Sequence, residues 1–215
     1  SEETNDRGLA MTASFTTMLM VAQFLAHAGD PERYKPIIED LSGATCRLFE
    51  NDSDLVKEAA ETGFKRAIFL GSGSQYGCAV ESSLKLQEMT EGQIVCKADT
   101  FLGVRHGPEV VVDNETLVVY FLSSEPFVRR YELDLMKEVK TKGLGMKKVV
   151  VCAKVDDEIK DTVDYAIEFD RNSIFDIPDF YRPILDVTIG QLFGLFKSLA
   201  LGLKPDNPSE GGLIS

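Results

Sequence analysis

The sequence has few of the side chains that build metal centres or disulfide frameworks. Its only imidazoles are His27 and His106, and no cysteine forms a C-x-x-C pair with another. The four cysteines are Cys46, Cys78, Cys96 and Cys152. Structural zinc sites and redox dithiols place such residues at short, regular spacings. We therefore predict no metal site, and thiols that are reduced and mostly buried.

Long apolar runs and positive charge are also scarce. No run approaches the roughly 18–20 apolar residues of a membrane helix, and the first eight residues lack the order of a secretion signal. Lysine and arginine number 23 against 35 acidic residues, which gives a formal net charge of −12. Such a surface repels nucleic-acid phosphates and anionic lipids, although backbone N–H groups can still hold a small anion. We expect a soluble, cytoplasmic protein with no nucleic-acid or membrane partner.

The first third of the chain is helical in pattern. We predict three helices, over residues 10–28, 31–49 and 54–61. Asp30 before Pro31 is typical of an N-cap followed by proline at the first helical position. Residues 51–53 interrupt the pattern, and Gly63 is well placed as a left-handed C-cap.

From Lys65 onward, short apolar runs alternate with helical stretches. The runs cover residues 67–70, 94–97, 116–122, 148–152 and 165–169, and the helices cover 76–89, 127–142, 157–162 and 183–201. Such alternation predicts a parallel sheet covered by helices on both faces. The last helix is apolar almost all round, so we expect it to be buried in the core or at an interface. We divide the chain into a helical segment (1–64), an α/β domain (65–203) and a tail (204–215).

A glycine- and serine-rich stretch follows the first strand of this α/β domain. Gly71-Ser72-Gly73-Ser74-Gln75 leads from the strand into a helix, where free N–H groups can bind an anion. The alternative is a tight turn in which Ser74 merely caps the helix. A dinucleotide site is disfavoured, because the third fingerprint glycine and the acidic residue after the next strand are missing.

Two further motifs carry candidate chemistry. Glu81, Lys85 and Glu88 share one helical face, which is typical of a solvated ion-pair ladder but also suits a carboxylate kept ionised to act as a base. His106 lies in the turn Arg105-His106-Gly107-Pro108, and loops over a rigid sheet often carry reactive groups. We interpret His27 as incidental.

These motifs, in this order, resemble the second half of a double sugar isomerase (SIS) protein. Segments over residues 101–108, 116–123, 131–135 and 202–208 are most similar to the tagatose-6-phosphate ketose/aldose isomerases, also described as galactosamine-6-phosphate deaminase/isomerases. The isomerase half of glucosamine-6-phosphate synthase is a more distant likeness. The resemblance covers nearly the whole chain. It implies a flavodoxin-like, three-layer αβα sandwich with a five-stranded parallel sheet. Helices that include the end of a first SIS unit would precede the sandwich. The resemblance thus implies that the chain is a fragment or a part of a longer protein.

The resemblance also implies residue roles. Glu88 would move the proton between C2 and C1, His106 would assist ring opening, and Lys85 and Glu81 would support them. The sugar phosphate would contact Arg105 and the loop, that is Gly71, Ser72, Gly73, Ser74 and Gln75. No metal or organic cofactor is implied. In the synthase the histidine comes from a neighbouring subunit, which implies a homodimer or a higher homo-oligomer.

Two positions depart from the pattern of these families. The synthase uses a lysine in its C-terminal tail, and residues 207–215 contain none. Glu109 stands where lysine is expected in the most similar family. The first departure places assistance by a Schiff base in doubt, and the second weakens the assignment of the substrate.

The function that we predict is aldose–ketose isomerisation of a hexose 6-phosphate, in particular conversion of galactosamine 6-phosphate to tagatose 6-phosphate and ammonia. The alternative is a non-catalytic SIS module that binds a sugar phosphate and regulates a partner, since one fold hosts many functions. A structural dimerisation domain is the third possibility, and it leaves the turn around His106 unexplained.

Overall fold

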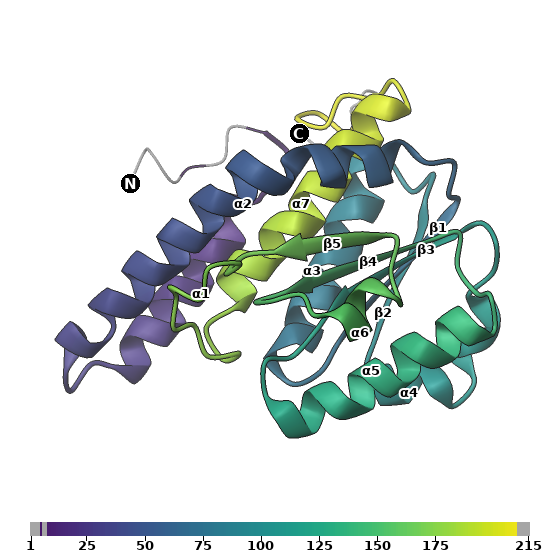
Figure 1. Cartoon of the computed structure of the whole chain (residues 1–215). Coiled ribbons are helices and arrows are strands. Elements are labelled where there is room, and N and C mark those ends of the chain that lie inside the picture. The colour runs from purple at the N-terminus through teal and green to yellow at the C-terminus, as the bar shows by residue number, and fades with distance from the viewer. Residues whose placement is uncertain (1–4, 6–7, 210–215) are drawn as a thin grey trace.

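A computed structural model describes residue 5 and residues 8–209 of the chain. Its centre is a five-stranded parallel sheet in the order β2-β1-β3-β4-β5 (Figure 1). The strands are β1 (Arg66–Gly71), β2 (Val95–Asp99), β3 (Thr116–Phe121), β4 (Lys147–Cys152) and β5 (Tyr165–Glu168). This is the flavodoxin-like order. The prediction of an αβα sandwich on a five-stranded parallel sheet is confirmed.

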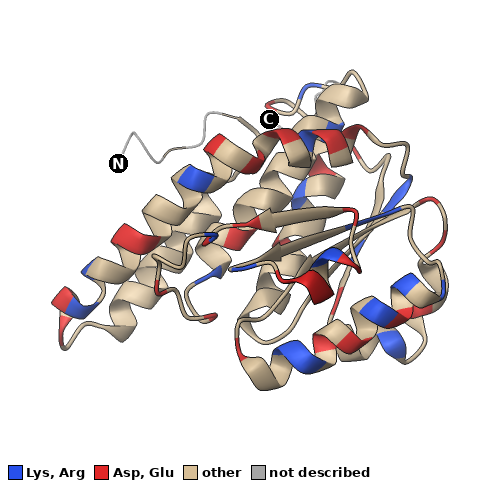
Figure 2. Ribbon diagram, viewed as in Figure 1, with Lys and Arg blue, Asp and Glu red and all other residues tan. Residues whose placement is uncertain are grey.

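Helices cover both faces of the sheet, and each face has its own apolar cluster. On one face lie α2 (Lys35–Glu61), α3 (Ser74–Met89) and α7 (Pro183–Ala200), with α1 (Ala13–Ala26) beside them (Figure 1). On the other lie α4 (Phe101–Arg105), α5 (Pro126–Thr141) and α6 (Asp157–Lys160). Strand β3 is buried at every position, because both neighbours and both helical layers cover it. Basic and acidic residues alternate along α5, whose outer face meets solvent (Figure 2).

The last helix, α7, is largely buried, as predicted. It packs directly against α3. Gly190 and Gly194 make this possible, since a Cβ at Gly190 would overlap the Ser82 side chain and one at Gly194 would lie 2.5 Å from the Met89 sulfur. Two glycines one turn apart therefore let the axes of the helices approach closely and fix the position of α3 on the sheet.

The helical beginning differs from the prediction in three ways. First, α2 runs unbroken through residues 51–53, because Asn51 donates to the Arg47 carbonyl and Ser53 to the Phe49 carbonyl, which keeps these turn-forming side chains within the helix. Second, Pro31 opens only a 3₁₀ turn, η2 (Pro31–Arg33), and Asp30 makes no capping hydrogen bond. Third, Gly63 has no left-handed backbone, since the chain leaves α2 at Thr62 in an extended conformation. The division of the chain at residues 64 and 203 stays a prediction.

The described residues contain neither a membrane-spanning helix nor a cluster of metal-ligating side chains. None of their helices is both long and apolar enough to cross a bilayer. No three of their histidine, cysteine, aspartate and glutamate side chains gather closely enough to hold a metal ion. The four cysteines are free thiols, with Cys78 and Cys152 buried, Cys96 partly buried and Cys46 exposed.

Candidate active site

The glycine- and serine-rich loop lies at the carboxyl end of β1, where the strand order reverses between β1 and β3. Gly73 is left-handed, with a φ of 56°. A Cβ on Gly71 would run into the backbone of the next turn, 2.8 Å from the Tyr76 nitrogen. The two glycines are therefore required by the sharp turn into α3. Ser74 does not cap the helix, whose N-cap is Gly73 without a side-chain bond.

The chain's own Asp179 lies against this loop. Its carbonyl accepts hydrogen bonds from the Ser74 hydroxyl (2.8 Å) and the Gln75 amide (3.0 Å). Its carboxylate accepts from the Ser123 hydroxyl and from the Ser124 N–H (3.0 Å), beyond the end of β3. An internal carboxylate thus occupies the crevice in which open α/β sheets bind anionic ligands. Burial alone would raise the pKa of Asp179, but the Arg182 cation and these donors lower it.

Arg182 ties the same segment into the core. The side chain is fully buried and donates to the Leu122 carbonyl (2.8 Å) and to Asp179 (2.9 Å). Its other nitrogen lies 2.9 Å from the fully buried carboxylate of Asp186. Burial raises the pKa of Asp186 to about 6, against the opposing effect of Arg182. Sequence reasoning missed these three charged residues, since nothing local marks them as neighbours of β1 and β3.

Glu132 is a further missed residue at this end of the sheet. Its carboxylate is buried on α5 and accepts a hydrogen bond from the Ser123 N–H (2.7 Å). Burial raises the pKa of Glu132, while bonds from Ser72 and Ser123 oppose the rise. The Ser74 and Gln75 side chains and the Ser123 N–H are thus bonded to other groups of the chain. The substrate-binding role of Gly71, Ser72, Gly73, Ser74 and Gln75 stays a prediction.

The acidic and basic triplet lies along the same helix, toward its C-terminus. The Lys85 ammonium is 2.7 Å from a carboxylate oxygen of Glu88 and 3.6 Å from one of Glu81. The Lys85 side chain is 7% exposed, whereas that of Glu88 is 39% exposed. Burial raises the pKa of Glu81, and Lys85 opposes the rise. The structure therefore brings the three residues together as a buried cation that holds one carboxylate open to solvent.

The loop and the triplet do not form one site within the chain. Helix α3 has 16 residues, so at about 1.5 Å per residue its two ends lie about 24 Å apart. A hexose phosphate is much shorter than this helix. One molecule that reaches Glu88 does not also reach Ser74 of the same chain.

His106 lies on the other side of the sheet from the triplet. It is exposed and follows α4, a short helix that the sequence did not predict and that Thr100 caps through the Gly103 N–H. Helix α4 packs against α5, whereas α3 packs against α7. Arg105, beside His106, pairs with Glu138 of α5 at 2.8 Å. Within one chain, the structure does not bring His106 or Arg105 to Glu88.

Two other sequence observations receive a structural explanation. Glu109, which departs from the expected lysine, pairs with Lys142 at 2.8 Å near the end of α5. The His27 Nε2 lies 2.7 Å from the Tyr181 hydroxyl, and its ring stacks on Tyr34. Burial raises the pKa of Tyr34 to about 12. These contacts fasten the end of α1 to the start of α2 and to the segment before α7.

Comparisons with known proteins show what the chain is similar to. No family model matches the chain. It is 34% identical over 215 residues to a D-galactosamine-6-phosphate deaminase, AgaS, of Escherichia coli, and the match covers 99% of this chain and 54% of that protein. The chain therefore spans about half the length of the curated relatives it matches.

Solved structures give the same result. A provisionally assigned tagatose-6-phosphate ketose/aldose isomerase from Clostridium novyi superposes with a TM-score of 0.94 at 35% identity, over 100% of this chain and 55% of that one. A tagatose-6-phosphate ketose/aldose isomerase from Escherichia coli gives a TM-score of 0.84 at 33% identity, over 100% and 56%. In each case the whole of this chain corresponds to about half of the longer protein.

Proposed function

We propose that this chain serves aldose–ketose isomerisation of a hexose 6-phosphate. The premise is that it is a SIS-domain half of the kind found in galactosamine-6-phosphate deaminases and tagatose-6-phosphate ketose/aldose isomerases. The substrate that we propose is galactosamine 6-phosphate, with tagatose 6-phosphate and ammonia as products. The observation that carries the proposal is Glu88, whose carboxylate rests on the buried Lys85 ammonium and still faces solvent.

The proposed chemistry is a proton transfer between neighbouring carbons. In the open-chain aldose, Glu88 takes the proton from C2, and the electron pair of that bond forms the C1–C2 double bond as the carbonyl oxygen gains a proton. Glu88 then returns a proton to C1, while the hydroxyl or amino group on C2 loses a proton to solvent and its electron pair forms the new double bond to C2. With an amino group on C2, the product is a ketose imine, which water hydrolyses to the ketose and ammonia. A positioned general base contributes about 10²–10⁴-fold to such a step.

Lys85 and Glu81 support the base. The Lys85 ammonium donates a hydrogen bond to the Glu88 carboxylate and so holds it in place. Glu81 holds the ammonium from the other side. Since Lys85 is buried against α7, the cation keeps its position while the substrate enters and leaves.

Ring opening by His106 requires a second copy of the chain in this proposal. His106 and Glu88 lie on opposite faces of one sheet, so the histidine that serves Glu88 would come from a partner. An exposed apolar stripe on α3 gives support. Its residues are Tyr76, Val80 and Leu84, and the spacing of four residues places them on one helical face that leads to Glu88. We therefore propose a cytoplasmic homodimer, or a higher homo-oligomer, as the active form.

The second candidate function is a binding module that senses a sugar phosphate. It is favoured by the separation of His106 from Glu88 within the chain, because a sensor needs no such pair. The two candidates differ in whether the C2 proton of a bound sugar exchanges with solvent.

Proton NMR of galactosamine 6-phosphate in D₂O tests the proposal. We expect loss of the C2 proton signal together with ketose and ammonia formation, and a fall in rate of about 10²–10⁴-fold in Glu88→Gln. Glu91→Gln makes the same chemical change just beyond the end of α3 and should leave the rate unchanged. Equal rates in wild type and Glu88→Gln would refute Glu88 as the base. Binding without exchange in the wild type would favour the sensor.

A further inference from the structure

A polar pocket lies away from the candidate active site, at the carboxyl end of β5. It has a volume of about 350 Å³ and contains no residue of α3 or α4. One wall is α2 and the other is the segment that follows β5. The lining residues are Arg47, Glu50, Asn51, Asp52, Glu168, Phe169, Arg171 and Asn172. A pocket of this volume is large enough for a small metabolite.

Asp52 is the unusual residue of this pocket. It stands in the middle of α2 and is 1% exposed, and its Oδ1 has no hydrogen-bond donor among the described residues. The nearest cation that pairs with it, the Arg171 guanidinium, lies 3.9 Å away, beyond hydrogen-bond distance. Leaving a buried carboxylate oxygen unbonded is unfavourable, because the oxygen has lost its water without gaining a donor. The pocket therefore lacks one donor at a defined place.

The neighbouring carboxylate does not share this deficit. Glu168 accepts hydrogen bonds from the Val155 N–H (2.9 Å) and from the Arg171 Nε (3.2 Å). Burial raises the pKa of Asp52, the Arg171 charge opposes the rise and the Glu168 charge adds to it. The missing donor is thus specific to Asp52.

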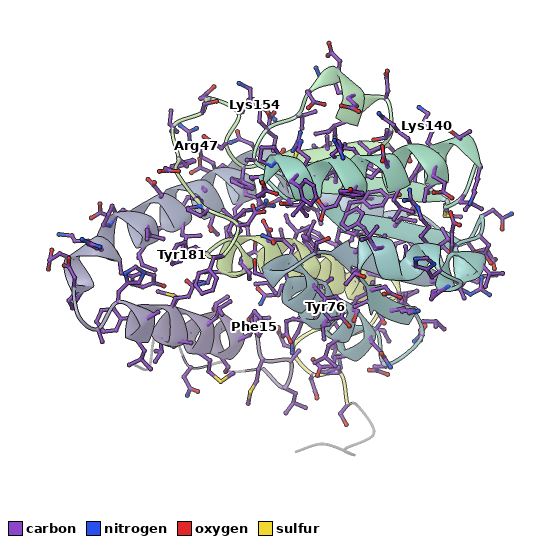
Figure 3. The ribbon with its side chains drawn as sticks, turned by 90° about the horizontal axis from the view of Figure 1, so that it is seen from below. Phe15, Arg47, Tyr76, Lys140, Lys154 and Tyr181 are labelled. Carbon is purple, nitrogen blue, oxygen red and sulfur yellow. The ribbon has the colours of Figure 1, made fainter. Side chains whose placement is uncertain are left out.

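The pocket also has a cation without a carboxylate partner. Arg47 makes no ion pair within the part of the chain that the structure describes, and its guanidinium instead lies over the Phe175 ring at 5.2 Å. It projects from α2 toward the segment after β5 (Figure 3). Such a guanidinium is suited to bind a carboxylate or a phosphate.

The wall opposite α2 is held in place. The Asp170 carboxylate accepts from the N–H groups of Ile174 (2.7 Å) and Phe175 (3.2 Å), and Asp40 on α2 accepts from the Asp176 N–H (3.1 Å). The pocket is therefore preformed, so that a ligand does not have to order it on binding.

We propose that this pocket binds a small zwitterion, whose ammonium group donates to Asp52 and whose anionic group pairs with Arg47. An ammonium supplies the donor that Asp52 lacks, and Glu50 at the rim adds a second acceptor. A bare metal ion fits less well, because two arginines line the pocket and the described residues hold no three-ligand cluster. The inference stands independently of the proposed function, since it uses no residue of that site.

The test is titration of the ¹⁵N-labelled chain with β-alanine and with 2-aminoethyl phosphate, followed by amide chemical shifts. Propionate and propylamine serve as probes that carry only one of the two charges. At about 20 mM, even a ligand with a Kd near 1 mM is close to saturation. We expect saturable shifts around Asp52 and Arg171 with the two zwitterions, and weaker binding of both single-charge probes. The stronger of the two zwitterions identifies carboxylate or phosphate as the anion.

Three variants locate the binding. Asp52→Asn should weaken zwitterion binding about tenfold or more, equivalent to about 1.4 kcal/mol. Arg47→Gln should weaken β-alanine but leave propylamine unchanged. Asp54→Asn makes the same change as Asp52→Asn at an exposed position on the same helix and is the control. The amide spectrum itself reports whether each variant is folded.

Three outcomes would overturn the inference. The first is the absence of a saturable shift with either zwitterion. The second is an equal affinity of Asp52→Asn and Asp54→Asn for the zwitterions. The third is binding of propylamine as tight as that of β-alanine. The last would make the pocket a site for ammonium alone.

Discussion

The two ends of α3 use charge in opposite ways. At the N-terminal end, the Ser74 and Gln75 side chains donate hydrogen bonds to the Asp179 carbonyl, and the buried Arg182 guanidinium pairs with the Asp179 carboxylate. At the C-terminal end, a buried lysine holds a carboxylate that remains open to solvent. The first arrangement pairs a carboxylate with a buried cation inside the fold, whereas the second leaves a paired carboxylate open to solvent.

This difference shows that a motif at the end of a strand need not be the reactive part of the helix that follows it. A glycine-rich turn at a topological switch point indicates an anion site. Here the turn bonds the Asp179 carbonyl, and the Asp179 carboxylate is bonded across the switch point by Ser123 and Ser124. The open carboxylate of Glu88 lies at the far end of the same helix. Variants at the two ends should therefore affect different properties, namely stability at the first and turnover at the second.

Removing the buried cation should have the largest effect on stability. Arg182→Met leaves the Asp186 carboxylate buried without a counter-charge, which costs about 3–5 kcal/mol of the free energy of unfolding. Urea denaturation measures this loss. Arg33→Gln, which breaks an exposed ion pair with Asp30, is the control and should cost about 1 kcal/mol or less. If the single variant does not fold, Arg182→Met combined with Asp186→Leu should restore much of the stability, because an apolar pair can replace a buried ion pair.

The pH dependence of stability should show the second-largest effect. Asp186 has a pKa of about 6 in the folded chain, against its ordinary value of 3.8. Between these values the folded state holds a proton that the unfolded state has lost, so the free energy of unfolding falls as pH rises. The expected fall is about 3 kcal/mol at about 1.4 kcal/mol per pH unit. It should be absent from Asp186→Asn, and a difference between the two proteins that stays constant over this window would contradict the assignment.

Glycine substitutions at the start of α3 should have a smaller effect. Gly71→Ala drives a methyl group into the backbone at Gln75 and should cost about 1–3 kcal/mol. Gly77→Ala is the matched control, because a Cβ there meets nothing within 4 Å. Since alanine is the better helix former, this control should gain up to about 1 kcal/mol. Thermal unfolding of the two variants in parallel would show whether the turn is as tight as the backbone indicates.

Glu88→Gln should have the smallest effect on stability. The carboxylate is more than a third exposed, so its ion pair with Lys85 contributes about 1 kcal/mol or less. The same variant should lose most of the proposed proton transfer, which C2 exchange by NMR measures. Stability and turnover lost together would show that the C-terminal end of α3 is also structural.

Much of the fold could be predicted from the sequence, because its signal is local. The three central strands β1, β3 and β4 are short, mostly apolar runs, as burial on both faces of a parallel sheet demands. The edge strands β2 and β5 are less buried, and β2 includes Lys97 and Asp99. The break predicted at residues 51–53 was wrong for a physical reason. Asn51 and Ser53 bond back to carbonyls one turn earlier, and the burial of α2 outweighs their preference for turns.

The candidate site could be predicted only in part. The triplet followed from spacing alone, since residues three and four apart share a helical face. The contact of Asp179 with Ser74 could not be found in this way, because 105 positions separate the two residues and neither has a distinctive neighbourhood. The separation of His106 from Glu88 depends on which face of the sheet each helix covers. The order of helices and strands along the sequence does not determine that face.

The position of Asp179 in the chain also sets an order of assembly. Contacts between residues far apart in sequence form late, because closing a long loop costs entropy before any contact repays it. During synthesis the N-terminal part of a chain emerges first. The turn at Gly71 and the start of α3 therefore lack their contacts with Asp179 until that residue has left the ribosome. The contacts across β1 and β3 form only when Asp179 is in place, so a chain interrupted before that residue would expose its serine-rich edge to any anion in its surroundings.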